Sequence, residues 1–254
     1  MSSCYLDVYA GERSKFEEED AQYQLTRSLL DKHASTFGLP SLPEDLDTEQ
    51  QDILGDVHKS DSQPLRFRAP MPLLLGRLIF QLDPAPGLAK TRQNFTALCT
   101  GEKGQCRSNP KKKLHYVGCP IHRVVRSFVA QGGDVTRGDG SGGESIYGPK
   151  FACEKAGLQA TPRKGSLAMA NSGGKSPVSS SQFFIVLADD EKSLAKLAGK
   201  YAVFGQVVPS EDSGRILNRL NEVSRPTGSS DETPSVPVWI GGCGFRINPL
   251  LWTH

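Results

Sequence analysis

The residues with the clearest potential for chemistry lie in the run IHRVVRSFVAQGGD (121–134), where two apolar, strand-like stretches surround a short polar break. Residues two apart in an extended strand share one face, whereas direct neighbours point to opposite faces. The break at 126–127 lets the chain turn, which brings the cation of Arg123, the ring of Phe128 and the amide of Gln131 toward one cleft. We therefore expect a ligand-binding cleft in which hydrogen-bonding groups lie beside an apolar floor.

Two further runs, LAMANSG (167–173) and SSQFFIVL (180–187), follow later in the chain. Together with 121–134 they resemble the most characteristic segments of the cyclophilins, the peptidyl-prolyl cis-trans isomerases, and the resemblance extends from Gly76 to the end of the sequence. It implies a mostly β, cyclophilin-like fold: a closed eight-stranded antiparallel β-barrel capped by two α-helices, in a single domain over residues 1–254.

The resemblance also assigns roles to individual residues. Arg123 matches the catalytic arginine, and Phe128 matches the aromatic floor of the proline pocket. Val129 stands where methionine is usual, and Tyr201 stands where many members of the family carry histidine. The other matches line the substrate cleft: Gln131, Ala170, Asn171, Gln182, Phe184 and Leu197.

The implied reaction is rotation about X–Pro peptide bonds, whose barrier is about 20 kcal/mol because amide resonance must be broken. A site accelerates this rotation by binding the twisted amide more tightly than either planar form, and it needs no cofactor, metal or nucleophile to do so. Arg123 suits such a site because a guanidinium is always charged and presents a rigid fork of donors.

The implied partners are proline-containing peptides and proteins, and the implied role is to assist protein folding as a monomer. The alternative is a non-catalytic module that holds a proline segment of a partner or acts as a scaffold, and the retained Arg123 favours the enzyme because a module does not need that cation. Cyclosporin-sensitive members carry a tryptophan just before the position of Leu197, whereas the segment ADDEKSLAKLAGK (188–200) contains none. We therefore expect weak cyclosporin binding.

The elements that must position these residues can be read from the apolar pattern. Strands are expected at 4–10, 75–82, 203–208 and 236–240, and helices at 21–33, 91–101 and 210–223, whereas 38–64 reads as loop. The main barrel segment is expected at 73–246, followed by a tail at 247–254. The run YLDVYAGE resembles the opening strand and turn of the family, so residues 11–72 are interpreted as an acidic, partly helical insertion in the first hairpin; the alternative is an N-terminal extension.

Composition narrows the class of protein. The 254 residues contain 26 glycines and 17 prolines, which favours short strands joined by turns. No apolar run approaches the roughly 20 residues that a membrane helix needs, and the first residues do not resemble a secretory signal.

Residues 11–60 carry twelve acidic and five basic side chains, although the whole chain has a net charge of +2. This acidic segment either folds back on the basic part of the chain, competes with an acidic partner or is simply solvated.

Six cysteines without a secretory signal indicate reduced thiols and a cytoplasmic or nuclear protein. Cys99 and Cys243 match a pair that lies close together in divergent-loop cyclophilins and forms a regulatory disulfide there, and Glu144 matches the acidic residue that contacts their extra loop. The alternative is that both are reduced core residues. The spacing of the Cys and His residues fits no usual metal site, and the run at 111–113 is too short to indicate nucleic-acid binding.

Overall fold

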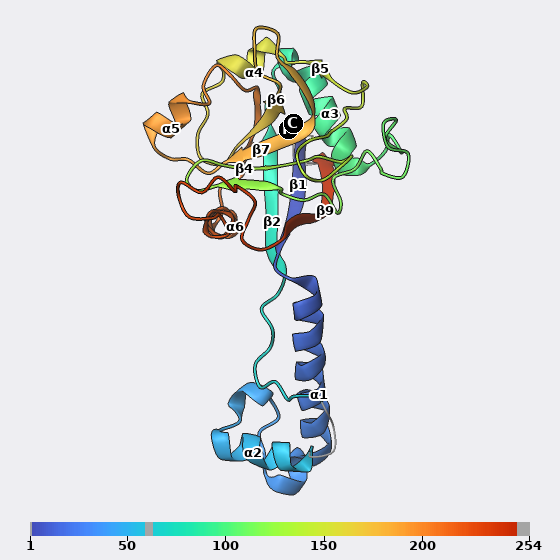
Figure 1. Cartoon of the computed structure of the whole chain (residues 1–254), viewed down its shortest axis with the longest axis vertical. Helices are drawn as coiled ribbons and strands as arrows, with labels where there is room; N and C mark the ends of the chain where they lie inside the picture. Colours follow the sequence, from blue (N-terminus) through green and yellow to red (C-terminus); the bar gives the residue numbers. More distant parts are fainter. Residues whose placement is uncertain (1, 59–62, 248–254) are drawn as a thin grey trace, which may run out of the picture. The chain divides into compact units, whose positions relative to one another are not determined.

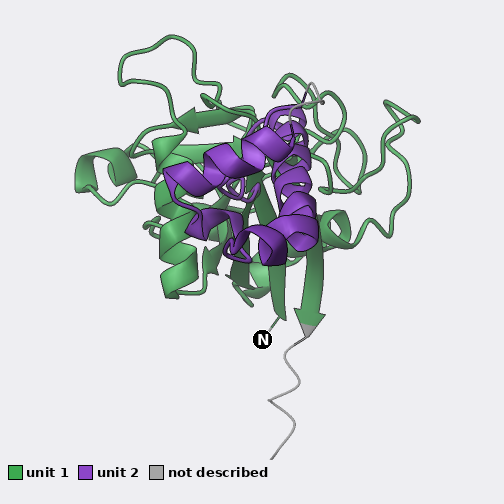
Figure 2. Ribbon diagram, turned by 90° about the horizontal axis from the view of Figure 1, so that it is seen from below, with its two compact units in different colours: residues 1–10, 74–254 green, residues 11–73 purple. Residues whose placement is uncertain are grey.

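The computed structural model describes residues 2–58 and 63–247 of the chain. The chain divides into two compact units, one formed by Met1–Ala10 with Leu74–His254 and the other by Gly11–Leu73, which Figure 2 shows in green and purple. Each unit has its own buried apolar cluster. The last part of the expected tail, 248–254, lies outside the described residues.

The first unit is built on one antiparallel sheet, in which eight strands follow the order β3-β4-β7-β6-β8-β2-β1-β9 and β5 pairs with β7. The strands are β1 (Ser2–Ala10), β2 (Leu74–Leu82), β3 (Arg123–Val125), β4 (Val129–Gly132), β5 (Phe151–Ala152), β6 (Ser166–Asn171), β7 (Val178–Val186), β8 (Val203–Val207) and β9 (Val238–Ile247). The sheet curls into an open half-barrel, so the expectation of a closed eight-stranded barrel is wrong.

The barrel stays open because β3 and β9 are the two edges of the sheet and do not pair with each other. The segment before β3 does approach β9, since Ile121 N donates to Val238 O at 2.9 Å, but the strand contact there is the isolated bridge between Pro120 and Trp239. Pro120 and Trp239 form a non-hydrogen-bonded pair, flanked by that bond and by the bond from Ile240 N to Cys119 O at 3.0 Å, and the pairing does not continue into β3.

β1 lies between β2 and β9, and the three strands run side by side in Figure 1. The pairing with β2 runs from Ser3 opposite Gln81 to Tyr9 opposite Leu74, although the whole segment Gly11–Leu73 separates these strands in the sequence. Alternate residues of β1 are buried in the core, as expected for a strand with one face inward.

Two 12-residue helices, α3 (Ala89–Thr100) and α6 (Glu211–Glu222), carry buried side chains of this unit, and α4 (Lys155–Gln159) and α5 (Glu191–Ala195) are single turns. α6 packs against β2 at a glycine: Gly76 has φ 139°, and a Cβ added there would lie 2.8 Å from Ile216 Cδ1. α3 has no side-chain cap at its own N-cap residue, Leu88. The carboxylate of Glu154 instead accepts from Lys90 N and Thr91 N, at 3.2 and 2.8 Å.

The second unit contains α1 (Arg13–Phe37), a short 3₁₀ turn (Pro43–Asp45) and α2 (Thr48–Val57). The helix expected at 21–33 is therefore longer, and the prediction of loop throughout 38–64 is wrong. α2 begins with a capping box, in which Asp47 and Gln50 each accept from the other's backbone N–H. A small cluster of buried leucines, Leu30, Leu46 and Leu54, holds the unit together.

Candidate active site

Four neighbouring strands place the expected site residues in one row across the sheet. Arg123 on β3 lies opposite Gln131 on β4, Gln131 lies opposite Phe184 on β7, and Phe184 lies opposite Ala168 on β6. Residues directly opposite each other in antiparallel strands share a face and are close enough for their side chains to interact. The cation, the amide and the aromatic ring therefore stand side by side on one face.

The alternation of side chains along these strands separates this face from the main core. Val124, Ala130 and Phe183 point inward and belong to the large core cluster. Their neighbours belong to a second apolar cluster, which we call the outer cluster: Val129, Ala168, Phe184, Val186, Ala188 and Leu197, with Phe128, Ala170, Leu194, Tyr201 and Val203 packed against it. Six of the expected site residues thus form one apolar surface outside the barrel core.

Two aromatic contacts order this surface. The rings of Phe184 and Tyr201 pack edge to face, with centroids 5.1 Å apart. Lys196 Nζ lies 6.0 Å from the centroid of the half-buried Phe128 ring. Phe128 follows a tight turn in which Ser127 adopts φ 52° and its N–H donates to Asn221 Oδ1 at 2.7 Å. The polar break expected at 126–127 is this turn.

Arg123 stands at the edge of the outer cluster and is held by two acceptors. Its Nη1 donates to Gln131 Oε1 at 3.3 Å, and its Nε donates to the carboxylate of Glu232. Gln131 Nε2 donates onward to Gln182 Oε1 at 2.9 Å. The Arg123 side chain is one third exposed, so it remains accessible to a ligand.

The polar half of the site lines a cavity of about 350 Å³ beside this chain of hydrogen bonds. Gln182 Nε2 donates to the carbonyl oxygens of Gly140 and Gly142, at 2.8 and 2.7 Å, and Asn171 Nδ2 donates to Lys200 O at 2.7 Å. The lining is Gln131, Gly140–Gly143, Lys150, Ala170–Ser172, Val178, Ser180 and Gln182. Fixed amide groups beside an open cavity suit recognition of an extended peptide.

A buried carboxylate fixes the glycine-rich wall of this cavity. Asp134 accepts from the backbone N–H groups of Thr136, Arg137, Gly140 and Gly142, at 2.9 to 3.1 Å. Burial by itself would raise the pKa of Asp134, but these hydrogen bonds outweigh it and lower the pKa to about 2. The wall is therefore built around a permanent negative charge.

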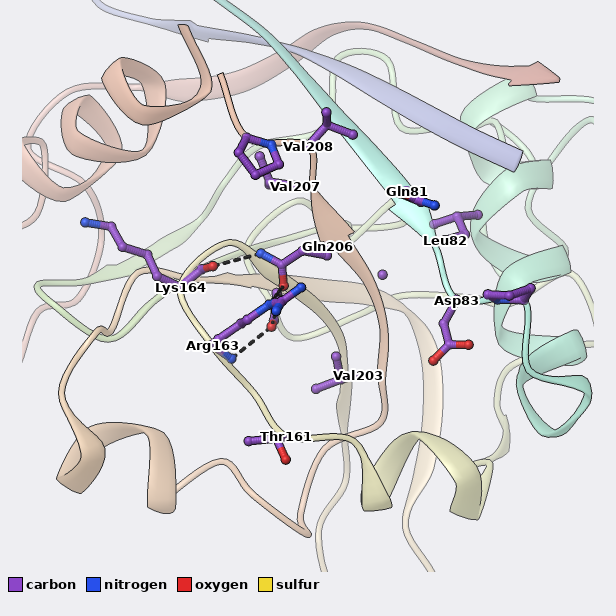
Figure 3. A pocket seen from close by; sticks show the side chains of 14 residues that line it. Gln81, Leu82, Asp83, Thr161, Arg163, Lys164, Val203, Gln206, Val207 and Val208 are labelled. Carbon is purple, nitrogen blue, oxygen red and sulfur yellow. Dashed lines mark hydrogen bonds between the residues drawn. The ribbon is translucent and has the colours of Figure 1, made fainter. Parts of the chain in front are cut away.

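A larger cavity, about 590 Å³, lies elsewhere and contains none of the expected site residues (Figure 3). Its polar groups bond to one another: Gln206 Nε2 donates to Lys164 O at 2.8 Å, and Gln206 Oε1 accepts from Arg163 Nε at 3.2 Å. It also lacks an aromatic floor, since its described lining has no Phe, Tyr or Trp. We therefore place the candidate active site at the outer cluster and not in this larger cavity.

Cys99 and Cys243 are brought together, as expected. Cys243 Sγ donates to Cys99 O at 3.3 Å, so the thiol of Cys243 lies against the backbone of Cys99. Cys4 is a further neighbour of Cys99 that sequence reasoning missed. Burial raises the pKa of Cys99, whereas the Cys243 side chain is only half-buried.

Glu144 makes the contact expected of it. Its carboxylate accepts from the N–H groups of Arg107 and Ser108, both at 2.8 Å, in the loop between α3 and β3.

Glu232 is the functional candidate that sequence reasoning missed. It lies 109 residues from its partner Arg123, within a polar turn-forming run, and nothing in the spacing points to it. In the part of the chain that is described, no helix has the length and apolar character to cross a membrane.

Comparison with known proteins identifies a family and similar solved structures. A family described as "Cyclophilin type peptidyl-prolyl cis-trans isomerase/CLD" matches residues 70–245 of this chain. A crystal structure of a cyclophilin-type peptidyl-prolyl cis-trans isomerase from Cryptosporidium parvum is similar with a TM-score of 0.53 and 31% sequence identity, over 69% of this chain and 94% of that chain.

Proposed function

The chain belongs to the cyclophilin-type peptidyl-prolyl cis-trans isomerases, and we propose that it rotates X–Pro peptide bonds in the cleft formed by Arg123, Gln131 and the outer cluster. The observation that carries this proposal is the row that places a cation, an amide and an aromatic ring on one face of three adjacent strands. Proline-containing peptides are its substrates.

The arrangement supplies what the rotation requires. The outer cluster offers an apolar floor on which a pyrrolidine ring can lie, with Phe128 and Phe184 as its rings. Gln131 and Asn171 hold the flanking backbone, so the chain on one side of the proline is fixed while the other side turns. Arg123 donates to the prolyl amide as its conjugation is lost, which stabilises the twisted form more than the planar ones.

A protease-coupled assay on an Ala-Pro tetrapeptide tests this assignment. Arg123→Ala should lower kcat/KM by about 100-fold or more because a donor to the transition state is lost. Arg126→Ala is the matched control: Arg126 lies three residues away and donates to Ser224 Oγ at 3.0 Å, so its loss should leave kcat/KM close to wild type. Wild-type protein that binds the peptide without accelerating its isomerisation would instead identify a non-catalytic binding module.

We further propose that Gly11–Leu73 is an insertion in the first hairpin and not an extension before it. The direct pairing of β1 with β2 across this segment supports the proposal.

We also propose that the protein acts in a reducing compartment, the cytoplasm or the nucleus, and the free thiols of all six cysteines support this. There the protein assists folding as a monomer, because slow X–Pro rotation limits the folding of many chains.

We also propose that Cys99 and Cys243 form a redox pair. A hydroperoxide oxidises the half-buried Cys243 to a sulfenic acid and is itself reduced to water or an alcohol; Cys99 then attacks that sulfur and expels water to close the disulfide. Peroxide treatment followed by thiol mapping should link Cys99 to Cys243 and lower isomerase activity, and dithiothreitol should restore both. An unchanged rate in the oxidised protein would rule out a regulatory role.

A further inference from the structure

Glu232 is the carboxylate that faces Arg123. Its Oε2 accepts from Arg123 Nε, while Arg123 Nη1 donates to Gln131 Oε1 at 3.3 Å on the other side. The two charged side chains are 33% and 42% exposed, so water reaches the pair and the carboxylate does not bury the cation. The guanidinium is thus held at two points, by β4 and by the polar loop that connects α6 to β9.

The position of Glu232 does not depend on its own side chain. Its backbone carbonyl accepts from Val124 N at 2.8 Å, which pins this point of the loop to β3 next to Arg123. Ser235 N donates to Val223 O at 2.7 Å, which anchors the following part of the loop to the end of α6. A change of the Glu232 side chain therefore leaves the backbone that presents it in place.

We propose that Glu232 is a positioning residue for the isomerisation, an inference that rests on the role proposed for Arg123. A free arginine side chain samples many rotamers, and a donor that must be ordered during the reaction stabilises the transition state less than a preorganised one. With Nε occupied by Glu232 and Nη1 by Gln131, the plane of the guanidinium is fixed and its remaining N–H groups keep one direction. The fixed donor stabilises the twisted amide, which needs the hydrogen bond most. It contributes little to the binding of the planar substrate.

Kinetics of side-chain variants test the proposal. Glu232→Ala should lower kcat by roughly tenfold with KM within about twofold, the pattern expected when an interaction specific to the transition state weakens. Glu232→Gln should recover part of the loss because its amide oxygen still accepts a hydrogen bond. Asp231→Asn is the matched control: Asp231 is the adjacent exposed carboxylate, lies 2.8 Å from Arg225 Nε instead, and should keep wild-type kcat.

A double-mutant cycle separates failure of this inference from failure of the proposed function. In an Arg123→Ala background, Glu232→Ala should have no further effect on kcat, and thermal melting should confirm that every variant is folded. A full loss of activity in Arg123→Ala together with wild-type kcat in Glu232→Ala would overturn the role of Glu232 alone. A tenfold loss that persists in the Arg123→Ala background would also overturn it, because the effect would not pass through the arginine. Wild-type activity in Arg123→Ala would overturn the proposed function itself.

Discussion

Lys196 occupies the position just before Leu197, where cyclosporin-sensitive members of the family carry tryptophan. Its ammonium lies 6.0 Å from the Phe128 ring centroid, so an indole at this position would adjoin the apolar floor. We expect Lys196→Trp to tighten cyclosporin binding by roughly tenfold, since an indole adds a large apolar face and an N–H donor. Drug titration of isomerase activity measures the change.

The control for this variant is Lys192→Trp, which adds the same indole to an exposed position on α5. Its inhibition constant should match that of the wild type. Equal inhibition of all three proteins would contradict the assignment of Lys196 to the drug-binding face.

At the residue scale, the sequence could predict the members of the site but not all of their partners. The alternation of Val124, Ala130 and Phe183 with their outward neighbours follows from the two-residue period of a strand. Glu232 could not be predicted, because a carboxylate in a polar loop reaches Arg123 only after α6 and β9 have taken their places. The backbone carbonyl groups that accept from Gln182 could not be predicted from the sequence either, because every residue type has a backbone carbonyl.

At the scale of elements, apolar periodicity located strands and amphipathic helices but gave no information on closure of the sheet. α6 begins directly after its capping residue Ser210, close to where the sequence placed it, because Ser210 and Ser213 satisfy each other's backbone N–H groups. α2 was missed because its Asp- and Gln-rich sequence is typical of loops as well as of helix starts. The open edge depends on which strands pair with each other, and no single segment reveals that.

The pairing of β1 with β2 leads to a prediction for the segment between them. Replacement of Gly11–Leu73 by Asn-Gly should leave a folded sheet, because Tyr9 and Leu74 already lie opposite each other and Ala10-Asn-Gly then forms a three-residue hairpin loop with glycine at its last position. We expect kcat/KM on the tetrapeptide to stay within about threefold of wild type, given that loop length has little effect on closure entropy.

Deletion of residues 1–73 provides the comparison for this experiment. It removes β1, which lies between β2 and β9, and should prevent folding. Soluble, active protein after that deletion would contradict the interpretation of Gly11–Leu73 as an insertion.

At the scale of the whole molecule, protonation of Asp134 at low pH lowers the free energy of unfolding. Its pKa is about 2 in the folded protein and 3.8 in an ordinary setting, so the folded state binds this proton more weakly. The contribution is fully present above pH 4 and is lost as the pH falls toward 2; a shift of this size corresponds to about 2 kcal/mol. Urea unfolding of wild type and Asp134→Asn should show a difference in the free energy of unfolding that shrinks by this amount between pH 5 and pH 2. A difference that does not change with pH would contradict it.

The place of β1 in the sheet also fixes an order of events during synthesis. β1 is made first, yet one of its two neighbours, β9, is the last strand described, and their pairing joins Ser2 with Ile247. Such long-range pairing slows folding, because the chain must close a large loop before the contact stabilises anything. During synthesis, the buried leucines of Gly11–Leu73 can pack together early, because all of them lie within this segment. One edge of β1 stays unpaired until β9 has been made. The sheet that carries the candidate active site is therefore complete only after β9, the last of its described strands, has been made.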